Sequence, residues 1–365
     1  MTLNPELRIR ETQIRPVIVP MKRPLRTSSG AVTQAPLLLI DLCTEEGVTG
    51  RSYLFAYQLF ALKPLYDLVQ GLAAILRGEV IAPLDLDRKL RAKMTLIGPQ
   101  NLVGMALSGL DMACWDALAV GAGMPLAVLL GGSTGPVQAY NSNGLGIMSA
   151  VEAGDEAAKL VEEGFRAIKI RLGRSTASED LAAVRAARQS VGDEVTRMAD
   201  FNQALSVSEA LTRGRMLDEE GLCWIEEPVR ADDLPGCARI AAELKTPVQI
   251  GENFASVFQM QEALQLRASD FVMPDVQRIG GVSGWMRAAA LAHAAGCEMS
   301  SHLFPEVSAH LLRVAPTCHW LEFVDWAGPL LKQPLQIQDG TAVVSDRPGS
   351  GLVWDEQAVA KFRVS

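Results

Sequence analysis

The sequence predicts an α+β amino-terminal domain followed by a (β/α) barrel, and three observations support this fold class. The first part of the chain contains alternating, strand-like segments that give way to helical periodicity. The middle part alternates short apolar strands with amphipathic helices, and this pattern recurs about every 20–30 residues, as is typical of a barrel rather than an open sheet. Each strand of this middle part also ends in a polar residue.

Length and charge limit the possible classes of protein. At 365 residues the chain is too long for one small core, and two domains are favoured. The formal net charge of −8 provides no general attraction for nucleic acid, so we expect no nucleic-acid partner. We find no signal-like amino terminus and no window of about 18 apolar residues, and we therefore expect a cytoplasmic protein that does not enter a membrane. The six scattered cysteines form no C-x-x-C pair and predict reduced, buried thiols.

The first domain is expected to span residues 1–131. Residues 6–20 alternate like a half-exposed strand, 21–34 form a polar segment that we interpret as a loop, and 35–54 contain two strands around a Glu-Gly turn. Apolar residues then recur at helical spacing over about 58–76 and 102–120. This pattern predicts a small antiparallel sheet with helices packed against it.

The barrel is expected to span residues 132–330. Its predicted strands are VQAYNS, AIKIRLG, TRMADFN, CWIEEP, PVQIGEN, FVMPDV, EMSSHLF and HWLEFV. The remaining residues, 331–365, contain GTAVVSDRPGSGLVW, which we expect to form strands that return to the first domain. Because the carboxyl ends of barrel strands share one rim, the polar residues at these ends should converge. They are Ser142, Lys169, Arg171, Asp200, Asn202, Glu226, Glu252, Asp275, His302 and Glu322.

Three carboxylates indicate a metal site. Asp200, Glu226 and Glu252 follow one another at intervals of 26 residues, one barrel unit each. Carboxylates held together repel one another unless a cation joins them, and a set of oxygen ligands favours a hard ion such as Mg²⁺. The sequence therefore predicts a Mg²⁺ site at the rim.

Two further pairs of residues have a chemical interpretation. Lys169 and Arg171 lie two apart on one strand, so both side chains face the same way and place two cations near the pocket, where an anionic partner is expected. His302 ends one strand and Asp275 the preceding one. A carboxylate beside an imidazole fixes its tautomer and raises its basicity, which predicts a general base.

The chain resembles the mandelate racemase and muconate lactonizing enzyme family, within the enolase superfamily. The barrel segments that carry the resemblance are KIR, ADFNQ, WIEEP, QIGENF, MPDVQRIGGVSGW, MSSHLF and HWLEFVDWAG. The similarity extends to VPMKRPLRTSSG and SYLFAY in the first domain and to PGSGLVW near the end. Such a combination is far more specific than one short motif.

The resemblance implies an α+β capping domain, a modified TIM barrel, and a carboxy-terminal segment that packs on the capping domain. It also implies a Mg²⁺-dependent enzyme that removes the α-proton of a small carboxylate, is cytoplasmic and forms a homo-oligomer. The implied metal ligands are Asp200, Glu226 and Glu252, and the implied base is His302 with Asp275. Lys169 would neutralise the substrate carboxylate, and Glu322 would be a protonated carboxyl group that donates to it. The implied substrate contacts are Ser142, Asn202 and a distal pocket of Leu25, Val32, Phe55, Tyr57 and Leu303.

One departure from the family pattern leaves two reactions open. The racemase of the family carries Lys-x-Lys, and its second lysine is a base opposite the histidine, whereas this chain has Lys169-Ile170-Arg171. A guanidinium is a poor default base near neutral pH. Racemisation or epimerisation of a 2-hydroxy acid between His302 and Arg171 is the reaction we expect by a small margin, because of the overall resemblance and the apolar Phe55, Tyr57 and Leu303; dehydration is the alternative. Dehydration of an acid sugar by His302 alone is favoured by Arg171 and by the polar Arg26, Ser28 and Ser29. A non-catalytic metal-binding scaffold is disfavoured, since the three metal positions, both members of the dyad and Glu322 are retained.

Overall fold

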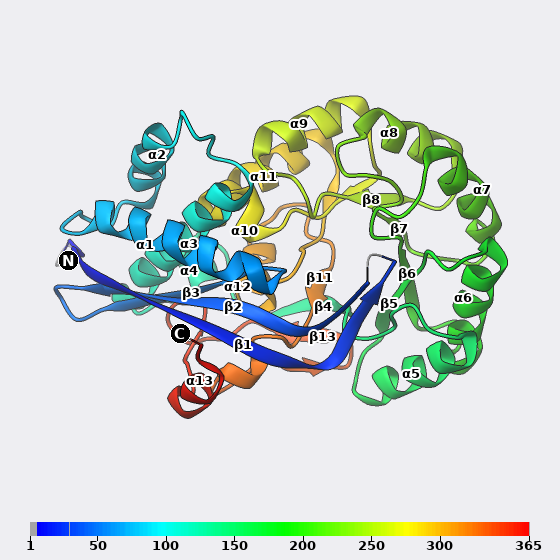
Figure 1. Cartoon of the computed structure of the whole chain (residues 1–365), viewed down its shortest axis with the longest axis horizontal. Helices are drawn as coiled ribbons and strands as arrows, with labels where there is room; N and C mark the ends of the chain where they lie inside the picture. Colours follow the sequence, from blue (N-terminus) through cyan, green and yellow to red (C-terminus); the bar gives the residue numbers. More distant parts are fainter. Residues whose placement is uncertain (1–5, 29, 365) are drawn as a thin grey trace.

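The capping domain is an antiparallel sheet covered by helices. The computed structural model describes residues 6–28 and 30–364. Strands β1 (Ile9–Thr27), β2 (Gly30–Thr44) and β3 (Thr49–Phe55) form the sheet in that order. The helices that follow them are α1 (Leu59–Leu76), α2 (Pro83–Lys93), α3 (Asn101–Gly121) and α4 (Leu126–Leu129). The apolar sides of β2 and β3 pack on α3, which lies between the sheet and the barrel (Figure 1).

The prediction of a loop over residues 21–34 was wrong. Strands β1 and β2 continue through this segment as one long hairpin, in which Leu25 pairs with Val32 and Thr27 with Gly30. The sequence looked like a loop because most of its residues are polar or exposed, and the other face of the ribbon is only half-buried, at positions such as Leu25 and Val32. The hairpin reaches the barrel, where the carbonyl of Arg26 accepts a hydrogen bond from the Ile147 backbone at 2.9 Å (Figure 1).

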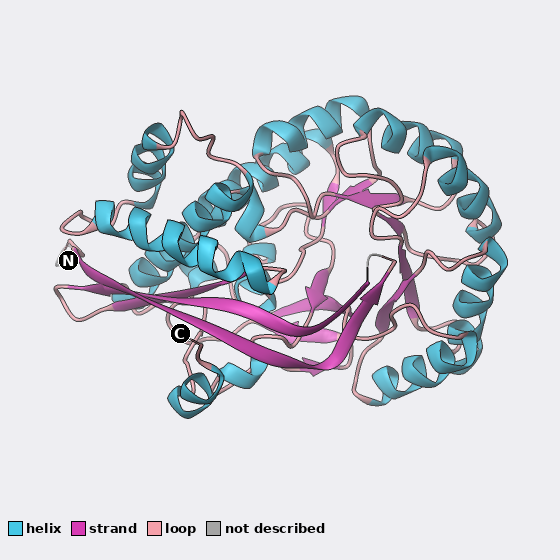
Figure 2. Cartoon of the chain, viewed as in Figure 1, coloured by secondary structure: helices cyan, strands magenta, loops and turns pink. Residues whose placement is uncertain are grey.

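The barrel is built from eight parallel strands. In order of pairing these are β4 (Pro136–Asn141), β5 (Ala167–Arg171), β6 (Thr196–Asp200), β7 (Ile225–Glu226), β8 (Val248–Ile250), β9 (Phe271–Val272), β10 (Glu298–Met299) and β11 (Leu321–Phe323). Strand β11 pairs with β4, and an isolated parallel bridge joins Met299 to Cys318 just before β11. The sheet is thereby closed into a barrel (Figure 2).

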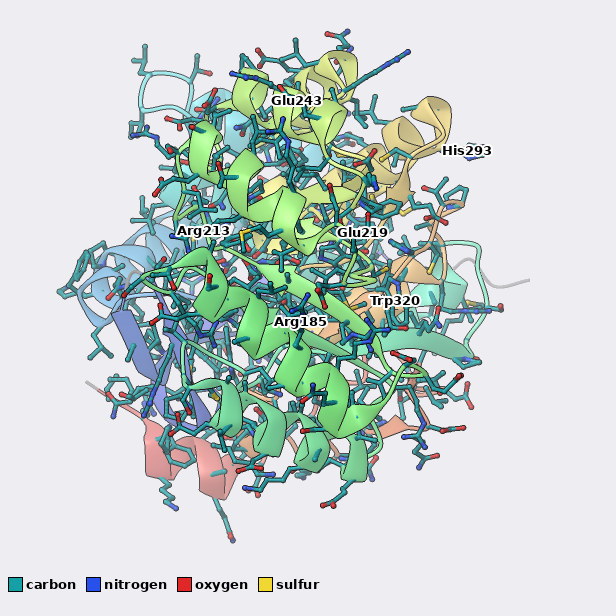
Figure 3. All side chains as sticks on the ribbon, turned by 90° about the vertical axis from the view of Figure 1, so that its right-hand side faces the viewer. Arg185, Arg213, Glu219, Glu243, His293 and Trp320 are labelled. Carbon is teal, nitrogen blue, oxygen red and sulfur yellow. The ribbon has the colours of Figure 1, made fainter. Side chains whose placement is uncertain are left out.

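Helices surround the barrel, and several begin at a strong sequence signal. They are α5 (Ala150–Glu162), α6 (Ala177–Val191), α7 (Val207–Leu217), α8 (Leu234–Glu243), α9 (Val257–Leu266), α10 (Val276–Ile279), α11 (Gly281–Ala295) and α12 (Pro305–Leu312). Ser149, Thr176 and Ser206 each form a capping box with the glutamate three residues later. Figure 3 shows the outer face of this ring, where the labelled Arg185 and Glu219 form ion pairs with Glu220 and Lys245.

The carboxy-terminal segment has two parts, and only the second returns to the capping domain. After the short 3₁₀ helix Gly328–Leu330, strands β12 (Ile337–Gln338) and β13 (Thr341–Val343) form a hairpin whose second strand pairs with β4 of the barrel. This corrects the expectation that these strands join the first domain. Beyond them, Trp354 donates to Asp41 at 2.8 Å, and α13 (Glu356–Phe362) packs against β1.

Two helices of the described chain are long and apolar enough, by length and composition alone, to span a membrane. They are α1 and α3. The expectation that the chain contains no apolar segment of this length was therefore wrong for these two helices. In α3, 83% of the apolar window is buried, which makes it a core helix of the fold. In α1 the buried share is 33%, and Leu65, Val69, Leu72 and Leu76 form its buried stripe.

Candidate active site

The polar strand ends converge at one rim of the barrel. Arg171, the last residue of β5, pairs with Asp200 of β6, and Asp200 pairs with Glu226 of β7. Because residues two apart on a strand share a face, Lys169 lies one layer below Arg171. Lys169, Asp200, Glu226, Asp275 and Glu322 are all almost completely buried.

Lys169 is the central cation of the cluster. Its Nζ lies 2.8 Å from Glu322 and 3.3 Å from Asp200, and it also donates a short hydrogen bond to Glu226. Burial alone lowers the pKa of an amine, but the surrounding carboxylates outweigh it and hold the pKa of Lys169 well above its usual value. Lys169 is therefore a fixed positive charge and not a base.

The three predicted metal ligands carry more negative charge than Lys169 can balance. Burial raises the pKa of Glu226 to about 8, and the negative charges of Asp200, Glu322 and Glu252 add to this rise. The buried amide oxygen of Asn202, beside Asp200, also has no hydrogen-bond partner. A divalent cation would satisfy both features, so this all-oxygen donor set fits Mg²⁺.

The side chains of the predicted metal ligands do not surround a common metal position in the described part of the chain. Within residues 6–28 and 30–364, no group of three His, Cys, Asp or Glu side chains forms such an arrangement. Asp200 and Glu226 point to Lys169, while Glu252 lies 3.4 Å from His302. In this arrangement the positive charge shared by Asp200 and Glu226 is the ammonium group of Lys169.

His302 and Asp275 form the expected dyad. His302 Nδ1 lies 2.8 Å from Asp275 Oδ2, and Nε2 points to the other carboxylates, 3.4 Å from Glu252 and 3.8 Å from Glu322. Burial lowers the pKa of His302, but Glu322, Glu252 and Asp275 more than reverse this and raise it to about 9. Asp275 thus keeps a proton on Nδ1 of His302. Nε2 faces Glu252 and Glu322 and is the ring nitrogen that can take up or release a proton.

The protonation of Glu322 depends on the charges around it. Burial raises the pKa of a carboxyl group, yet the nearby charges of Lys169 and His302 outweigh burial and hold the pKa of Glu322 below its usual range. Its Oε2 also accepts the Leu303 backbone N–H at 2.8 Å. These contacts favour the ionised form of Glu322 while Lys169 and His302 face it, and the neutral carboxyl group that the resemblance implies stays a prediction for the substrate complex.

Arg171 is held by its surroundings. Its guanidinium donates to the carbonyls of Gly144 and Ser142 at 3.0 and 3.1 Å, and to the Ser142 hydroxyl at 3.1 Å. It forms no ion pair with a carboxylate of the described chain, and its buried Nε has no partner. Ser142, predicted to touch substrate, therefore accepts from Arg171, and Arg171 is a fixed donor rather than a group poised to lose a proton.

Only some of the residues predicted for the distal pocket lie near one another in the structure. Phe55 is buried and packs on Tyr57 and Trp326, with ring centroids 4.5 and 4.9 Å apart. Leu303 is buried beside His302. Leu25 and Val32 face each other across the hairpin that docks on the loop after β4. Tyr57 differs from the prediction, because its hydroxyl lies 3.2 Å from Asp275 Oδ2 and so contacts the dyad.

Sequence reasoning missed two features of the site. Trp224 donates from its indole to Glu226 Oε2 at 2.9 Å, and the two-residue spacing on β7, which puts both on the inner face, could have revealed this. Strained backbone also gathers here. Non-glycine residues with positive φ follow Asp200, Glu226 and His302 within one to three residues: Asn202, Gln203, Glu227, Leu303 and Phe304. Such strain is often concentrated at functional sites.

Comparison with protein families gives two matches that together cover most of the chain. Residues 9–131 match the amino-terminal domain of mandelate racemase and muconate lactonizing enzymes, and residues 152–358 match the enolase C-terminal domain-like family. L-talarate/galactarate dehydratase of Salmonella typhimurium is 33% identical over 334 residues, covering 90% of this chain and 82% of that protein. Other relatives are dehydratases, racemases, epimerases and cycloisomerases.

Solved structures agree with the fold and with the cofactor. An enolase from alpha proteobacterium BAL199 with bound magnesium is 46% identical, with a TM-score of 0.96, covering 98% of this chain and all of that one. An enolase from Bradyrhizobium, in complex with magnesium and mandelic acid, is 45% identical, with a TM-score of 0.95 and full coverage of both chains. The predicted capping domain and barrel are confirmed, and Mg²⁺ is the cofactor common to these structures.

Proposed function

This chain belongs to the mandelate racemase and muconate lactonizing enzyme family of the Mg²⁺-dependent enolase superfamily, and we propose that it removes the α-proton of a 2-hydroxy carboxylate with His302 as the base. The observation that supports this proposal is the 2.8 Å contact between His302 and Asp275, with Nε2 directed toward the cluster of Glu252, Glu322 and Lys169. In its neutral form His302 is thus a proton acceptor that faces a group of charges suited to a carboxylate substrate. A cation bound beside Glu252 would lower the pKa of His302 from about 9 and favour this neutral form.

The chain's own residues account for most of the chemistry. His302 Nε2 accepts the α-proton, and Asp275 stabilises the imidazolium that forms. The electron pair of the broken C–H bond moves toward the substrate carboxylate and gives an enolate with a second negative charge. Lys169 lies where its ammonium can offset that charge. When a substrate carboxylate draws Lys169 from Glu322, the pKa of Glu322 rises, and a protonated Glu322 can then donate to the enolate oxygen.

Asp200, Glu226 and Glu252 would hold the metal. Bound Mg²⁺ supplies positive charge beside the substrate carboxylate, where negative charge grows during the reaction. Trp224 keeps one oxygen of Glu226 fixed by its 2.9 Å hydrogen bond, so this ligand needs little further ordering.

We favour dehydration of an acid sugar as the outcome. Arg171 donates three hydrogen bonds to the segment 142–144, so a second base on the opposite face of the substrate is lacking in this arrangement. With one base, the enolate expels its β-hydroxyl group, and the proton on His302 leaves with it as water. The enol product then becomes a 2-keto-3-deoxy acid. Arg26 and Ser28 supply polar groups near the hairpin turn; Ser29, named with them from the sequence, lies outside the described residues.

Racemisation is the second candidate, and a separate observation favours it. The Bradyrhizobium relative binds mandelic acid with magnesium, and here Phe55 and Leu303 are buried apolar residues next to the dyad. An aromatic 2-hydroxy acid would suit these side chains. It would require Arg171 to deliver or accept a proton.

Proton NMR in D₂O with Mg²⁺ distinguishes the two outcomes. Both enantiomers of mandelate and a panel of acid sugars are followed for α-proton exchange and product formation, with His302→Asn as the control. A 2-keto-3-deoxy product, or exchange from one configuration only, is expected. Interconversion of both enantiomers would instead establish racemisation, and the absence of exchange from every 2-hydroxy acid would refute the proposal.

A further inference from the structure

Tyr57 comes from the capping domain but contacts the barrel's catalytic dyad. Its hydroxyl lies 3.2 Å from Asp275 Oδ2, the oxygen that also contacts His302 Nδ1 at 2.8 Å. The other oxygen of Asp275 accepts the Gln277 backbone N–H at 2.7 Å. Asp275 therefore receives hydrogen bonds from three directions, and one of them crosses the domain boundary over 218 residues of sequence.

Arg278 fixes the direction of the Tyr57 hydroxyl. The guanidinium carbon of Arg278 lies 4.5 Å from the centre of the Tyr57 ring, and Nε donates to the phenolic oxygen at 3.3 Å. With its oxygen accepting from Arg278, Tyr57 has its own proton directed to Asp275. Burial raises the pKa of Tyr57 far above its usual value, so this proton is retained throughout the working range of pH.

The backbone around Tyr57 is held in a strained conformation. Tyr57 has φ of +60°, a region that residues other than glycine rarely adopt. Strand β3 ends at Phe55, whose backbone N–H donates to the Gln277 side chain at 3.0 Å. The sheet is thus tied to the segment that carries Asp275 by both the main chain of Phe55 and the side chain of Tyr57. Strained backbone conformations of this kind are concentrated at functional sites, where the surrounding structure holds them in place.

We propose that Tyr57 is a positioning residue of the reaction, through which the capping domain holds the Asp275 carboxylate in the orientation that accepts the Nδ1–H of His302. This inference rests on the proposed role of His302 as base. Hydrogen bonds that orient the ligands of metal sites from outside typically matter by about 10–100-fold, and we expect an effect of that order from the hydrogen bond that orients the partner of His302. Without the Tyr57 hydroxyl, Asp275 keeps Gln277 and His302 but loses the donor that fixes its rotation.

The test compares Tyr57→Phe with Tyr53→Phe in the full-length, Mg²⁺-loaded protein. Tyr53 is the matched control, because it lies four residues before Tyr57, on β3, and its buried hydroxyl also crosses the domain boundary, to Glu306 at 2.7 Å, without contacting the dyad. In Y57F we expect kcat to fall about 10-fold, with KM and the Kd for Mg²⁺ within about twofold and a larger kinetic isotope effect for α-deuterated substrate. In Y53F we expect kcat within about twofold of the wild type. Arg278→Gln should show the same signature as Y57F.

A second readout does not depend on turnover. The chain has four histidines, and the low-field proton NMR signal of His302 Nδ1–H can be assigned by its loss in His302→Asn. We expect this signal to shift or broaden in Y57F and R278Q but not in Y53F. If the wild type exchanges no α-proton, the proposed function fails, and this signal alone decides the role of Tyr57. Equal losses of kcat in Y57F and Y53F, or an unchanged signal in Y57F, would overturn the inference.

Discussion

At the scale of the residue, the site is governed by the placement of one lysine. Lys169 contacts Asp200, Glu226 and Glu322, which would otherwise be buried carboxylates without a countercharge. Removing one partner of a buried ionic cluster is costly, because the remaining charges keep their desolvation penalty. Lys169 therefore contributes to stability as well as to the proposed chemistry.

Lys169→Met separates these two contributions. Without Mg²⁺ we expect the free energy of unfolding to fall by about 3–5 kcal/mol, since three carboxylates lose their cation. With saturating Mg²⁺ the loss should be smaller, because the metal replaces that charge, while activity should remain abolished. Thermal unfolding in EDTA and in Mg²⁺ measures the difference. An equal loss in the two conditions would show that the metal does not join Asp200 and Glu226.

The role of Arg171 can be tested by changing it to the lysine that the racemase of the family carries at this position. Arg171→Lys restores Lys-x-Lys and gives an amine that can lose its proton when desolvated. We expect the wild type to exchange the α-proton of one configuration of substrate only, and R171K to gain exchange from the other. Proton NMR in D₂O of each pure enantiomer measures this, with His302→Asn as the reference for the His302 face. Exchange from both configurations in the wild type would contradict the proposed one-base reaction.

At the scale of the element, a buried histidine joins the two domains. His310 of α12 is buried, and its Nδ1 accepts the backbone N–H of Ala127 in α4 at 3.2 Å. Nδ1 must therefore be unprotonated in the folded state. Burial lowers the pKa of His310 from 6.5 to about 4, and a hydrogen bond with the Ser350 backbone opposes this shift only in part.

This contact predicts a specific dependence of stability on pH. Between about pH 6.5 and pH 4 the unfolded state binds a proton at His310 that the folded state does not, so stability should fall as the pH falls through this window. The loss attributable to His310 is at most about 3 kcal/mol. His310→Asn keeps an acceptor near Ala127 but cannot titrate, and its unfolding free energy should fall less steeply from pH 6.5 to 4.5. Denaturant titrations at several pH values test this. Parallel curves for the two proteins would contradict it.

At the scale of the whole molecule, the sequence predicted the barrel better than the parts that bridge the domains. Asp200, Glu226 and His302 could be placed at one rim because strand periodicity and barrel closure are local, repeating rules. The contacts of Tyr57 with Asp275 and of Tyr53 with Glu306 join residues 218 and 253 apart, and no local pattern encodes them. The hairpin was missed for another reason: a two-stranded ribbon with one exposed and one half-buried face has the polar composition of a loop. The roles of the individual site residues stay predictions.

The last prediction concerns the hairpin of β1 and β2, through which we expect the capping domain to take part in substrate binding. Its end, with the Leu25–Val32 pair, is held by the hydrogen bond from Ile147 to Arg26 and by the ion pair of Arg23 with Glu163 at 2.6 Å. Both anchors lie on the barrel, so the hairpin can cover the rim without any movement of the metal ligands.

Replacing residues 25–32 by Asn-Gly, which favours a two-residue hairpin turn, should shorten this cover while leaving the barrel intact. We expect KM for the best substrate to rise at least about 10-fold, since the apolar side chains of Leu25 and Val32 are lost from the distal pocket. The Kd for Mg²⁺ should be unchanged, because Asp200, Glu226 and Glu252 all belong to the barrel. Calorimetric titration with Mg²⁺ and steady-state kinetics measure the two quantities separately. An unchanged KM would show that the hairpin does not contact substrate, and a lost Mg²⁺ affinity would show instead that it supports the barrel rim.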